Sequence, residues 1–408
     1  MLKPVQGGVT AVAGFRAAGI HAGIKKVRKP DLALIVADKT CSTAGVFTTN
    51  RFAAAPVYLT KQHLKSGQLQ AIIANSGCAN ACTGIQGEAD AQEMAELTAK
   101  QLGIPRHLVG VASTGVIGEP LPMERLRTGI PRLVKALRTK GSHRAAQAIM
   151  TTDTFPKEAA VQAVIDGRSM TVGGIAKGSG MIHPNLAGPT RGATMLAFLT
   201  TDAAIDPPLL QQTLQTAVDL TFNMITVDGE TSTNDLVLCL ANGRVKGPKL
   251  PAASPALDAF QSAVTEVCLT LAKMIARDGE GATKLVEIVI RQAKDLAQAK
   301  TVGMAIARSP LVKTAFFGED PNWGRIMAAM GASGVDLDPH RIDIYVEEIP
   351  LVKGGLGLGK EAEKKASQAF KKHSFSLTVD LHTGPTTAQL FTCDLSTDYV
   401  KINAAYRT

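Results

Sequence analysis

The sequence predicts a mixed α/β fold in which short buried strands alternate with helices. Short apolar runs bounded by turn residues predict the strands, and a long stretch with apolar residues at three- and four-residue steps predicts a central helix. The composition of the 408 residues is 45% hydrophobic and 19% charged, which is typical of a globular protein. It excludes a disordered chain, a collagen-like chain and a coiled coil, and the length allows one large domain or two to three smaller ones.

The predicted strands share apolar, β-branched cores between polar or glycine-containing turns. They are Leu32–Val36, Ala71–Ala74, Val109–Ala112, Thr194–Thr200, Leu236–Leu240, Val286–Ile290, Ile342–Glu347 and Phe375–Leu381. Helices are predicted over Glu88–Leu102 and over Ser254–Arg277, where Pro255 marks the start and Gly279 follows the end. The glycine stretch Gly354–Gly359 predicts a surface loop, because its spacing fits no phosphate-binding pattern.

The charge balance favours a small acidic substrate over nucleic acid. The chain carries 44 Lys and Arg residues against 35 Asp and Glu residues, a net charge of +9. Aromatic residues make up only 4%, fewer than a surface for base stacking would need. The basic runs Lys25–Lys29, Lys364–Lys365 and Lys371–Lys372 are interpreted as solvated faces. We therefore expect no nucleic-acid partner and a cationic cleft for a small anion.

The cysteines and histidines predict neither a disulfide scaffold nor a metal centre. Six cysteines are spread along the chain, and several lie in apolar runs, so we expect buried and reduced thiols. The eight histidines form no cluster with metal-ligand spacing. The N-terminal Met1–Gly8 has no apolar signal core, and no apolar run reaches the roughly 18 residues of a membrane helix. A cytoplasmic protein without a membrane anchor is expected.

The segment Lys177–Gly192 is a long glycine- and proline-containing loop that leads directly into a predicted strand. Long loops of this kind are commonly functional. At its end, Thr194 follows the small residue Ala193. A threonine exposed as the first residue of a chain carries its own base, because its α-amine has a pKa of about 7.7–8.0. Taken alone, the same pattern is also that of a threonine that begins a β-strand.

Motifs along the whole chain resemble the ornithine acetyltransferase family, the self-cleaving glutamate N-acetyltransferases of cyclic arginine biosynthesis. The segments that carry this resemblance follow in chain order. They are Gly14–Gly19, Ala74–Asn80, Ser113–Gly118, Thr151–Lys157, Lys177–Ala187, Ala193–Asp202, Val227–Asn234, Arg277–Lys284, Glu319–Arg325 and Asn403–Thr408.

The chain departs from the family pattern at the expected cleavage site. In the family the Asn-Met-Ala-Thr run is continuous, whereas here Gly188–Ala193 separates Asn185-Leu-Ala187 from Thr194. The Ala-Thr-Met-Leu junction is restored at Ala193–Thr194, where we place the scissile bond. Thr190 is a weaker candidate because Pro189 precedes it. The extra residues put the efficiency of cleavage in doubt.

The resemblance implies a ping-pong transfer of an acetyl group from N2-acetylornithine to glutamate, with Thr194 as the nucleophile. It assigns Thr114 and Gly115 to the oxyanion hole, off the end of the strand Val109–Ala112. Lys177 would pair with a substrate carboxylate, and Glu280 would hold a substrate ammonium group. The substrate-binding set that it implies is Thr151, Lys177, Thr194, Glu280, Asn403 and Thr408.

The register within the Thr151 motif is less sure than the other assignments, because Thr152 and Thr154 lie close by. We interpret His183 as structural, since the α-amine of Thr194 would already supply a base.

The resemblance also implies a layered αββα sandwich, similar in layering to N-terminal-nucleophile enzymes, with a smaller C-terminal α/β part. Cleavage would give chains 1–193 and 194–408, expected to pair as a heterotetramer. No cofactor or metal is expected, and acetyl-CoA stays open as a second acetyl donor. The alternative function is an amidase or aminopeptidase with the same nucleophile, in which water accepts the acyl group.

Overall fold

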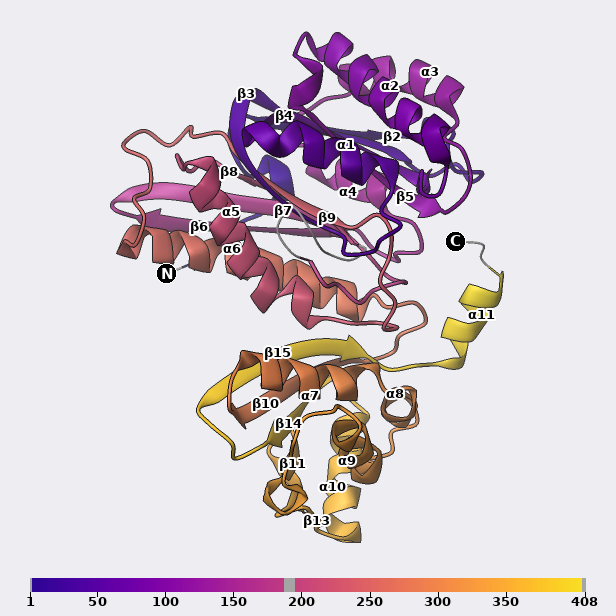
Figure 1. The fold of residues 1–408 in the computed structure, drawn as a ribbon, viewed down its shortest axis with the longest axis vertical. Coiled ribbons are helices and arrows are strands. Elements are labelled where there is room, and N and C mark those ends of the chain that lie inside the picture. Colours follow the sequence, from indigo (N-terminus) through magenta and orange to yellow (C-terminus); the bar gives the residue numbers. More distant parts are fainter. Residues whose placement is uncertain (1, 187–194, 406–408) are drawn as a thin grey trace. The chain divides into compact units, whose positions relative to one another are not determined.

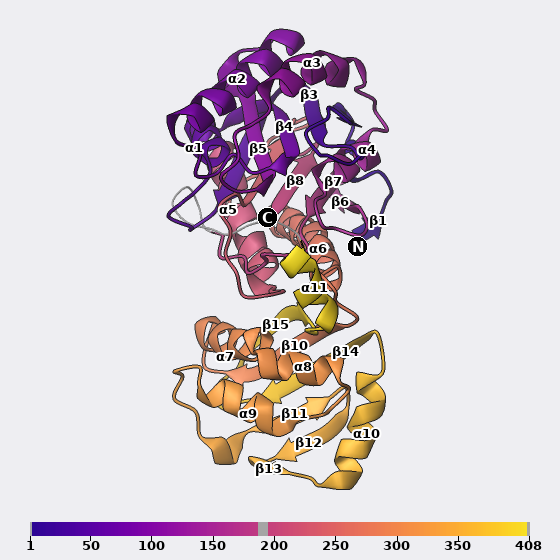
Figure 2. The same ribbon diagram turned by 90° about the vertical axis from the view of Figure 1, so that its right-hand side faces the viewer.

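The computed structural model describes residues 2–186 and 195–405, so that Ala193, Thr194 and Thr408, with Thr190 and the extra Gly188–Ala193, lie outside the described residues. The fold divides into two compact units (Figures 1 and 2). The N-terminal unit comprises Met1–Asn223 and Glu230–Leu271, and the C-terminal unit comprises Met224–Gly229 and Ala272–Arg407. The expected chain boundary at 193/194 differs from this division and stays a prediction.

The N-terminal unit is built on a nine-stranded mixed sheet with the order β1-β6-β7-β8-β9-β3-β4-β5, and β2 pairs with β3. The strands are β1 Leu2–Pro4, β2 Phe15–Ile20, β3 Leu32–Phe47, β4 Gln68–Cys78, β5 Val109–Val116, β6 Lys157–Ile165, β7 Arg168–Lys177, β8 Leu196–Thr201 and β9 Leu236–Ala241. The helices are α1 Ala55–His63, α2 Gly84–Leu102, α3 Met123–Lys135, α4 Ser142–Ile149, α5 Pro207–Leu220 and α6 Pro255–Arg277, which belongs to the C-terminal unit from Ala272 on.

Two hydrophobic cores lie on opposite faces of β3 and separate the layers of this unit. Figure 1 shows the helices and strands that form these layers. Leu32 and Leu34 pack in an outer core with residues of α2 and α3, whereas Ala33 and Ile35 face an inner core. The inner core also holds apolar residues of β7, β8, β9 and α4, so the two halves of the sheet face each other across it. Helix α6 covers the opposite face of β7, where Val267 and Leu271 approach Gly174. This αββα layering confirms the predicted class.

The C-terminal unit is a six-stranded sheet with the order β13-β12-β11-β14-β10-β15 and its own hydrophobic core. Its strands are β10 Leu285–Ala293, β11 Asp343–Val346, β12 Ile349–Lys353, β13 Leu356–Gly357, β14 Ser374–Asp380 and β15 Thr386–Cys393. Its helices are α7 Leu296–Arg308, α8 Pro310–Phe317, α9 Trp323–Gly331, α10 Lys360–Phe370 and α11 Thr397–Ala405. This is the smaller α/β part that the resemblance implies.

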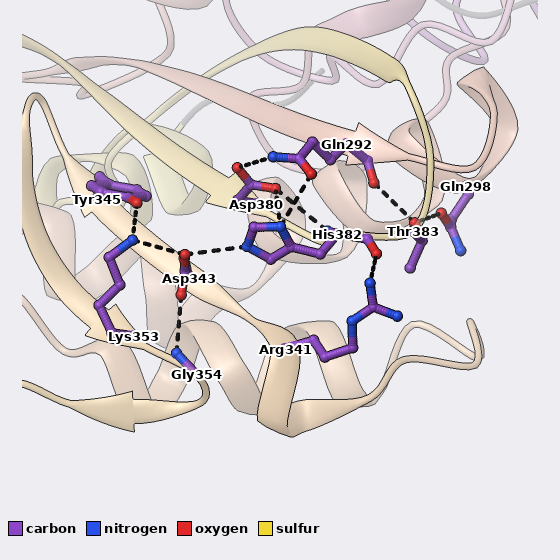
Figure 3. Close-up of polar contacts among 10 residues, drawn as sticks. All are labelled: Gln292, Gln298, Arg341, Asp343, Tyr345, Lys353, Gly354, Asp380, His382 and Thr383. Atoms are coloured by element: carbon purple, nitrogen blue, oxygen red, sulfur yellow. Dashed lines mark hydrogen bonds and ion pairs between the residues drawn. The ribbon is translucent and has the colours of Figure 1, made fainter.

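A polar cluster lies where β11, β14 and β10 of this unit come together (Figure 3). The Asp343 carboxylate accepts hydrogen bonds from Lys353 Nζ and from the backbone of Gly354, both at 2.9 Å. The ring of His382 reaches the same carboxylate at 3.2 Å, and Gln292 binds Asp380 at 2.9 Å. The Lys353 side chain remains 47% exposed, so the cluster is a surface network.

The structure corrects several predicted element boundaries. The strand predicted over Val109–Ala112 continues to Val116, and the strand predicted to start at Thr194 is described from Leu196. Part of the predicted loop Gly354–Gly359 forms the short strand β13. The six cysteines are free and five are buried as expected, but Cys82 is exposed.

Helix α6 is the one described helix that is long and apolar enough to cross a membrane, and half of its most apolar window is buried inside the protein. Since its apolar residues pack on β7, we interpret α6 as a core helix.

Candidate active site

Three of the predicted site residues meet in the N-terminal unit around the ammonium group of Lys177. Lys177 is the last residue of β7, and its side chain is almost fully buried. Its Nζ atom lies 2.9 Å from the hydroxyl oxygen of Thr151 and 3.5 Å from that of Thr114. Residues from β5, from the loop after α4 and from β7 therefore converge on one buried cation.

Thr114 and Gly115 lie within β5, so their predicted placement beyond the end of a strand is wrong, whereas their oxyanion-hole role stays a prediction. In the parallel pairing of β4 with β5, Gly115 is level with Gly77. Gly115 has a φ of +132°, and a Cβ atom there would lie 2.4 Å from the carbonyl carbon of Gly77. Only glycine fits this position, because any side chain would collide with the neighbouring backbone.

A buried amide network fixes the end of β5. Asn75 accepts a hydrogen bond from the Ser113 hydroxyl at 2.6 Å and donates one to the Cys78 carbonyl at 2.8 Å. Asn234, just before β9, donates to the carbonyls of Ala79 and Ser113 at 2.5 and 2.9 Å. Both asparagines belong to motifs that carried the family resemblance, but the sequence alone assigned them no role.

Asp153 is a further residue that the sequence reasoning missed. Its carboxylate lies 2.7 Å from Lys157 Nζ and 3.8 Å from Lys177 Nζ. It also accepts the backbone N–H groups of Gly178 at 2.7 Å and of Thr151 at 2.9 Å. Burial favours the neutral acid, but the two lysines and these hydrogen bonds outweigh burial and lower the pKa of Asp153 well below its usual range. The Asp153 carboxylate thereby fixes the position of the Lys177 ammonium group and of the Thr151 backbone.

A second buried acid, Asp235, precedes β9 and has the opposite character. It is fully buried, and neither carboxylate oxygen has a hydrogen-bond partner among residues 2–186 and 195–405. Burial raises the pKa of Asp235 well above its usual value, although the charge of Lys177 acts in the other direction. In the parallel register of β8 with β9, Leu236 pairs with Leu196, and its N–H donates to the carbonyl of Met195 at 3.0 Å. Asp235 and Met195 are therefore the residues immediately before the paired strands β9 and β8.

Two other predicted residues meet within the C-terminal unit. Glu280 is buried in the turn after α6, and its carboxylate accepts a hydrogen bond from the exposed Asn403 of α11 at 2.8 Å. The hydroxyl of Ser396 donates to the carbonyl of Gly281 at 2.6 Å, which ties the start of α11 to the same turn. The C-terminal helix is thus anchored at Glu280, and the substrate-binding roles expected for Glu280 and Asn403 stay predictions.

The remaining predictions concern metals and the basic runs. Within residues 2–186 and 195–405, no three His, Cys, Asp or Glu side chains group as metal ligands. The interpretation of Lys25–Lys29 as a solvated face is wrong for Lys25, because its ammonium group is bonded to two backbone carbonyls inside the protein.

Comparison with known proteins identifies the family of this chain. A sequence profile described as "ArgJ family" matches residues 16–408. The arginine biosynthesis bifunctional protein ArgJ of Symbiobacterium thermophilum is 51% identical over 404 residues, covering 98% of this chain and 99% of the relative. The protein of the same name from Geobacter sulfurreducens is 50% identical over 397 residues, covering 97% and 100%.

Two solved structures are similar over part of the chain. A crystal structure of ArgJ from Bacillus halodurans is 45% identical and covers 46% of this chain and 98% of that one, with a TM-score of 0.44. An ornithine acetyltransferase of Mycobacterium tuberculosis complexed with ornithine is 44% identical, covers 46% and 100%, and has a TM-score of 0.43. On the family profile and the sequence relatives, the chain belongs to the ArgJ family.

Proposed function

We propose that the chain is the precursor of an acetyltransferase that moves the acetyl group of N2-acetylornithine to glutamate. The observation that carries this proposal is the meeting of Lys177, Thr151 and Thr114 beside Gly115, in a chain of the ArgJ family. A buried ammonium group with hydroxyl neighbours is suited to bind a substrate carboxylate through charge-assisted hydrogen bonds.

The proposed reaction begins when the precursor cuts itself between Ala193 and Thr194, which gives Thr194 a free α-amine. The hydroxyl of Thr194 attacks the acetyl carbonyl of N2-acetylornithine, and the amine takes up the hydroxyl proton. Thr114 and Gly115 stabilise the oxyanion, at roughly 3 kcal/mol per donor. The proton then passes to the leaving nitrogen, so ornithine departs and the acetyl group remains as an ester on Thr194.

The second half-reaction restores the enzyme. The uncharged amine of glutamate attacks the ester, the Thr194 hydroxyl regains its proton, and N-acetylglutamate leaves. In this scheme Lys177 binds the substrate carboxylate and Glu280 binds the substrate ammonium group. Asn403 and Thr408 also belong to the substrate-binding set. We also propose acetyl-CoA as a second donor, chains 1–193 and 194–408 assembled as a heterotetramer, and a cytoplasmic location.

Intact-mass measurement and an acetyl-transfer assay on the purified full chain test this proposal. We expect two masses, a new N-terminal Thr194, and transfer of labelled acetyl from N2-acetylornithine to glutamate. Thr194→Ala should give one mass of 42.8 kDa and no transfer, whereas the control Thr190→Ala should behave as wild type. A single uncleaved mass with full activity would contradict the mechanism. Release of free acetate without transfer would indicate the amidase alternative, and a separate assay with acetyl-CoA tests the second donor.

A further inference from the structure

Lys25 lies in the connection between β2 and β3, and the backbone of this connection is fixed around one carboxylate. Asp31 accepts hydrogen bonds from the N–H groups of the four successive residues Ala22 to Lys25, at distances between 2.6 and 3.1 Å. The Asp31 side chain is fully buried. The Cα atom of Lys25 is therefore held in place, and its side chain projects from a rigid base.

The ammonium group of Lys25 is bonded to the peptide that carries Thr151. Lys25 Nζ donates to the carbonyl of Pro30 at 2.8 Å and to the carbonyl of Met150 at 2.7 Å. The Met150 carbonyl belongs to the peptide bond with Thr151, whose hydroxyl contacts Lys177 Nζ at 2.9 Å. Lys25 thus holds the peptide bond before Thr151, and Lys177 contacts the Thr151 side chain.

The aliphatic part of the Lys25 side chain packs against Gly77 in β4. A Cβ atom on Gly77 would come within 3.0 Å of Lys25 Cγ, and Gly77 is level with Gly115 in the pairing of β4 with β5. Since Gly77 carries no side chain, the lysine stem can pack directly on the β4 backbone beside the proposed oxyanion residues.

The charged groups around Lys25 make its own charge sensitive to pH. Burial and the neighbouring charge of Lys177, with a smaller effect of Lys29, lower the pKa of Lys25 to about 8, while Asp31 and Asp153 act in the opposite direction. At neutral pH its ammonium group is therefore mostly charged and adds to the positive potential of Lys177, whereas above about pH 8 this charge is lost.

We infer that Lys25 is a positioning and specificity-determining residue of the acetyl-transfer site: it holds the Met150–Thr151 peptide and, with Lys177, makes the site selective for amino-acid substrates that carry carboxylates. This inference rests on the proposed function. A neutral lysine can still donate hydrogen bonds to both carbonyls, so the positioning and the electrostatic contribution respond differently to pH.

Steady-state kinetics with glutamate as the varied substrate, from about pH 6 to about pH 10, test the inference on the full-length protein. For wild type we expect the KM for glutamate to rise above about pH 8, as Lys25 loses its proton. Lys25→Met should raise this KM about tenfold at pH 7 and remove the rise, because one cation of the pair is absent at every pH. Lys25→Arg stays charged over the whole range, so it should keep a lower KM than Lys25→Met and also lack the rise.

The matched control is Lys26→Met, which removes one positive charge from the exposed neighbouring residue and should reproduce wild-type kinetics. Thermal unfolding of each variant separates lost stability from lost binding. The inference is overturned if wild type shows no alkaline rise in KM. It is also overturned if Lys25→Met keeps wild-type kinetics, or if Lys25→Arg and Lys25→Met lose activity and stability equally. A wild-type protein that transfers no acetyl group instead refutes the proposed function itself.

Discussion

The Nζ atom of Lys157 lies 2.7 Å from Oδ1 of Asp153, and both side chains have no solvent exposure. A buried ion pair stabilises a fold only when its remaining hydrogen-bonding capacity is satisfied. Asp153 meets this condition, because the N–H groups of Gly178 and Thr151 bind its two oxygens. The pair therefore connects the stability of the N-terminal unit to the position of Lys177, which begins the glycine loop.

Asp153→Asn should destabilise the protein by roughly 3–5 kcal/mol, because it removes the buried carboxylate that lies 2.7 Å from the buried Lys157 ammonium group. Urea unfolding followed by fluorescence or circular dichroism measures this free energy. The double variant Asp153→Asn with Lys157→Met should recover part of the loss, since it also removes the buried positive charge. A loss below about 1 kcal/mol for the single variant would show that the pair contributes no more to stability than a surface ion pair.

Asp343→Asn in the surface cluster of Figure 3 should cost no more than about 1 kcal/mol, because its partner Lys353 is 47% exposed. Burial opposes ionisation of Asp343, but the hydrogen bonds from Lys353, Gly354 and His382 outweigh it and lower its pKa. Its stabilising effect is therefore present above the unfolded pKa of about 4 and declines below it. Unfolding at pH 7 with and without 1 M salt, about a 3 Å screening length, measures the contribution. A salt-insensitive loss as large as that of Asp153→Asn would contradict the prediction.

Asp235→Asn should change how stability depends on pH. In the unfolded chain this carboxyl group ionises near pH 4, whereas in the fold burial raises its pKa, so that it keeps its proton to a higher pH. The folded state then binds the extra proton, so wild type should lose up to about 1.4 kcal/mol per pH unit above pH 4 from this group. The asparagine variant lacks this loss. Unfolding free energies of both proteins between about pH 4 and pH 8 measure the difference, and a difference independent of pH would refute the assignment.

Gly115→Ala should abolish acetyl transfer and cost about 3 kcal/mol or more, because its methyl group would lie 2.4 Å from the Gly77 backbone. The control Gly118→Ala lies in the same segment at a φ of +82°, with no heavy atom within 4 Å of the added methyl group. It should cost only about 1–2 kcal/mol of backbone strain. Unfolding and activity are measured for both, and equal effects would show that close approach is not what requires glycine at 115.

The strands with continuous apolar runs were predictable from sequence, and the glycine-containing strand β7 was not. The runs in β3, β4 and β9 are buried on both faces, so their pattern needs no tertiary information. Strand β7 contains Gly173 and Gly174, which normally weaken a strand prediction. Tertiary packing requires both glycines. A Cβ atom on Gly173 would lie 2.0 Å from the carbonyl oxygen of Gly8, and one on Gly174 would lie 2.5 Å from the Leu199 side chain.

The candidate site shows a similar division. Thr114, Thr151 and Lys177 are far apart in sequence, so only the family resemblance could place them together before the sheet order was known. The roles of Lys25 and Asp153 depend on burial and on contacts with backbone carbonyls and amides, which leave no signature in a lysine-rich run or a Thr-Thr-Asp-Thr motif. Within the Lys25–Lys29 run, Lys25 was therefore misinterpreted as surface charge, whereas Lys26 and Lys29 are exposed as expected.

The pairing of Lys177 in β7 with Leu196 in β8 also constrains when the chain could be cut. The central sheet takes β7 from before the expected scissile bond and β8 and β9 from after it, and β9 in turn pairs with β3. Both chains would therefore contribute strands to one sheet, and cleavage that depends on the folded site would follow the formation of this sheet. Once cut, the two pieces could reassemble only by a bimolecular encounter, so recovery from denaturant would depend on protein concentration. Cleavage would then be irreversible, because the cut chains could not refold as a single molecule.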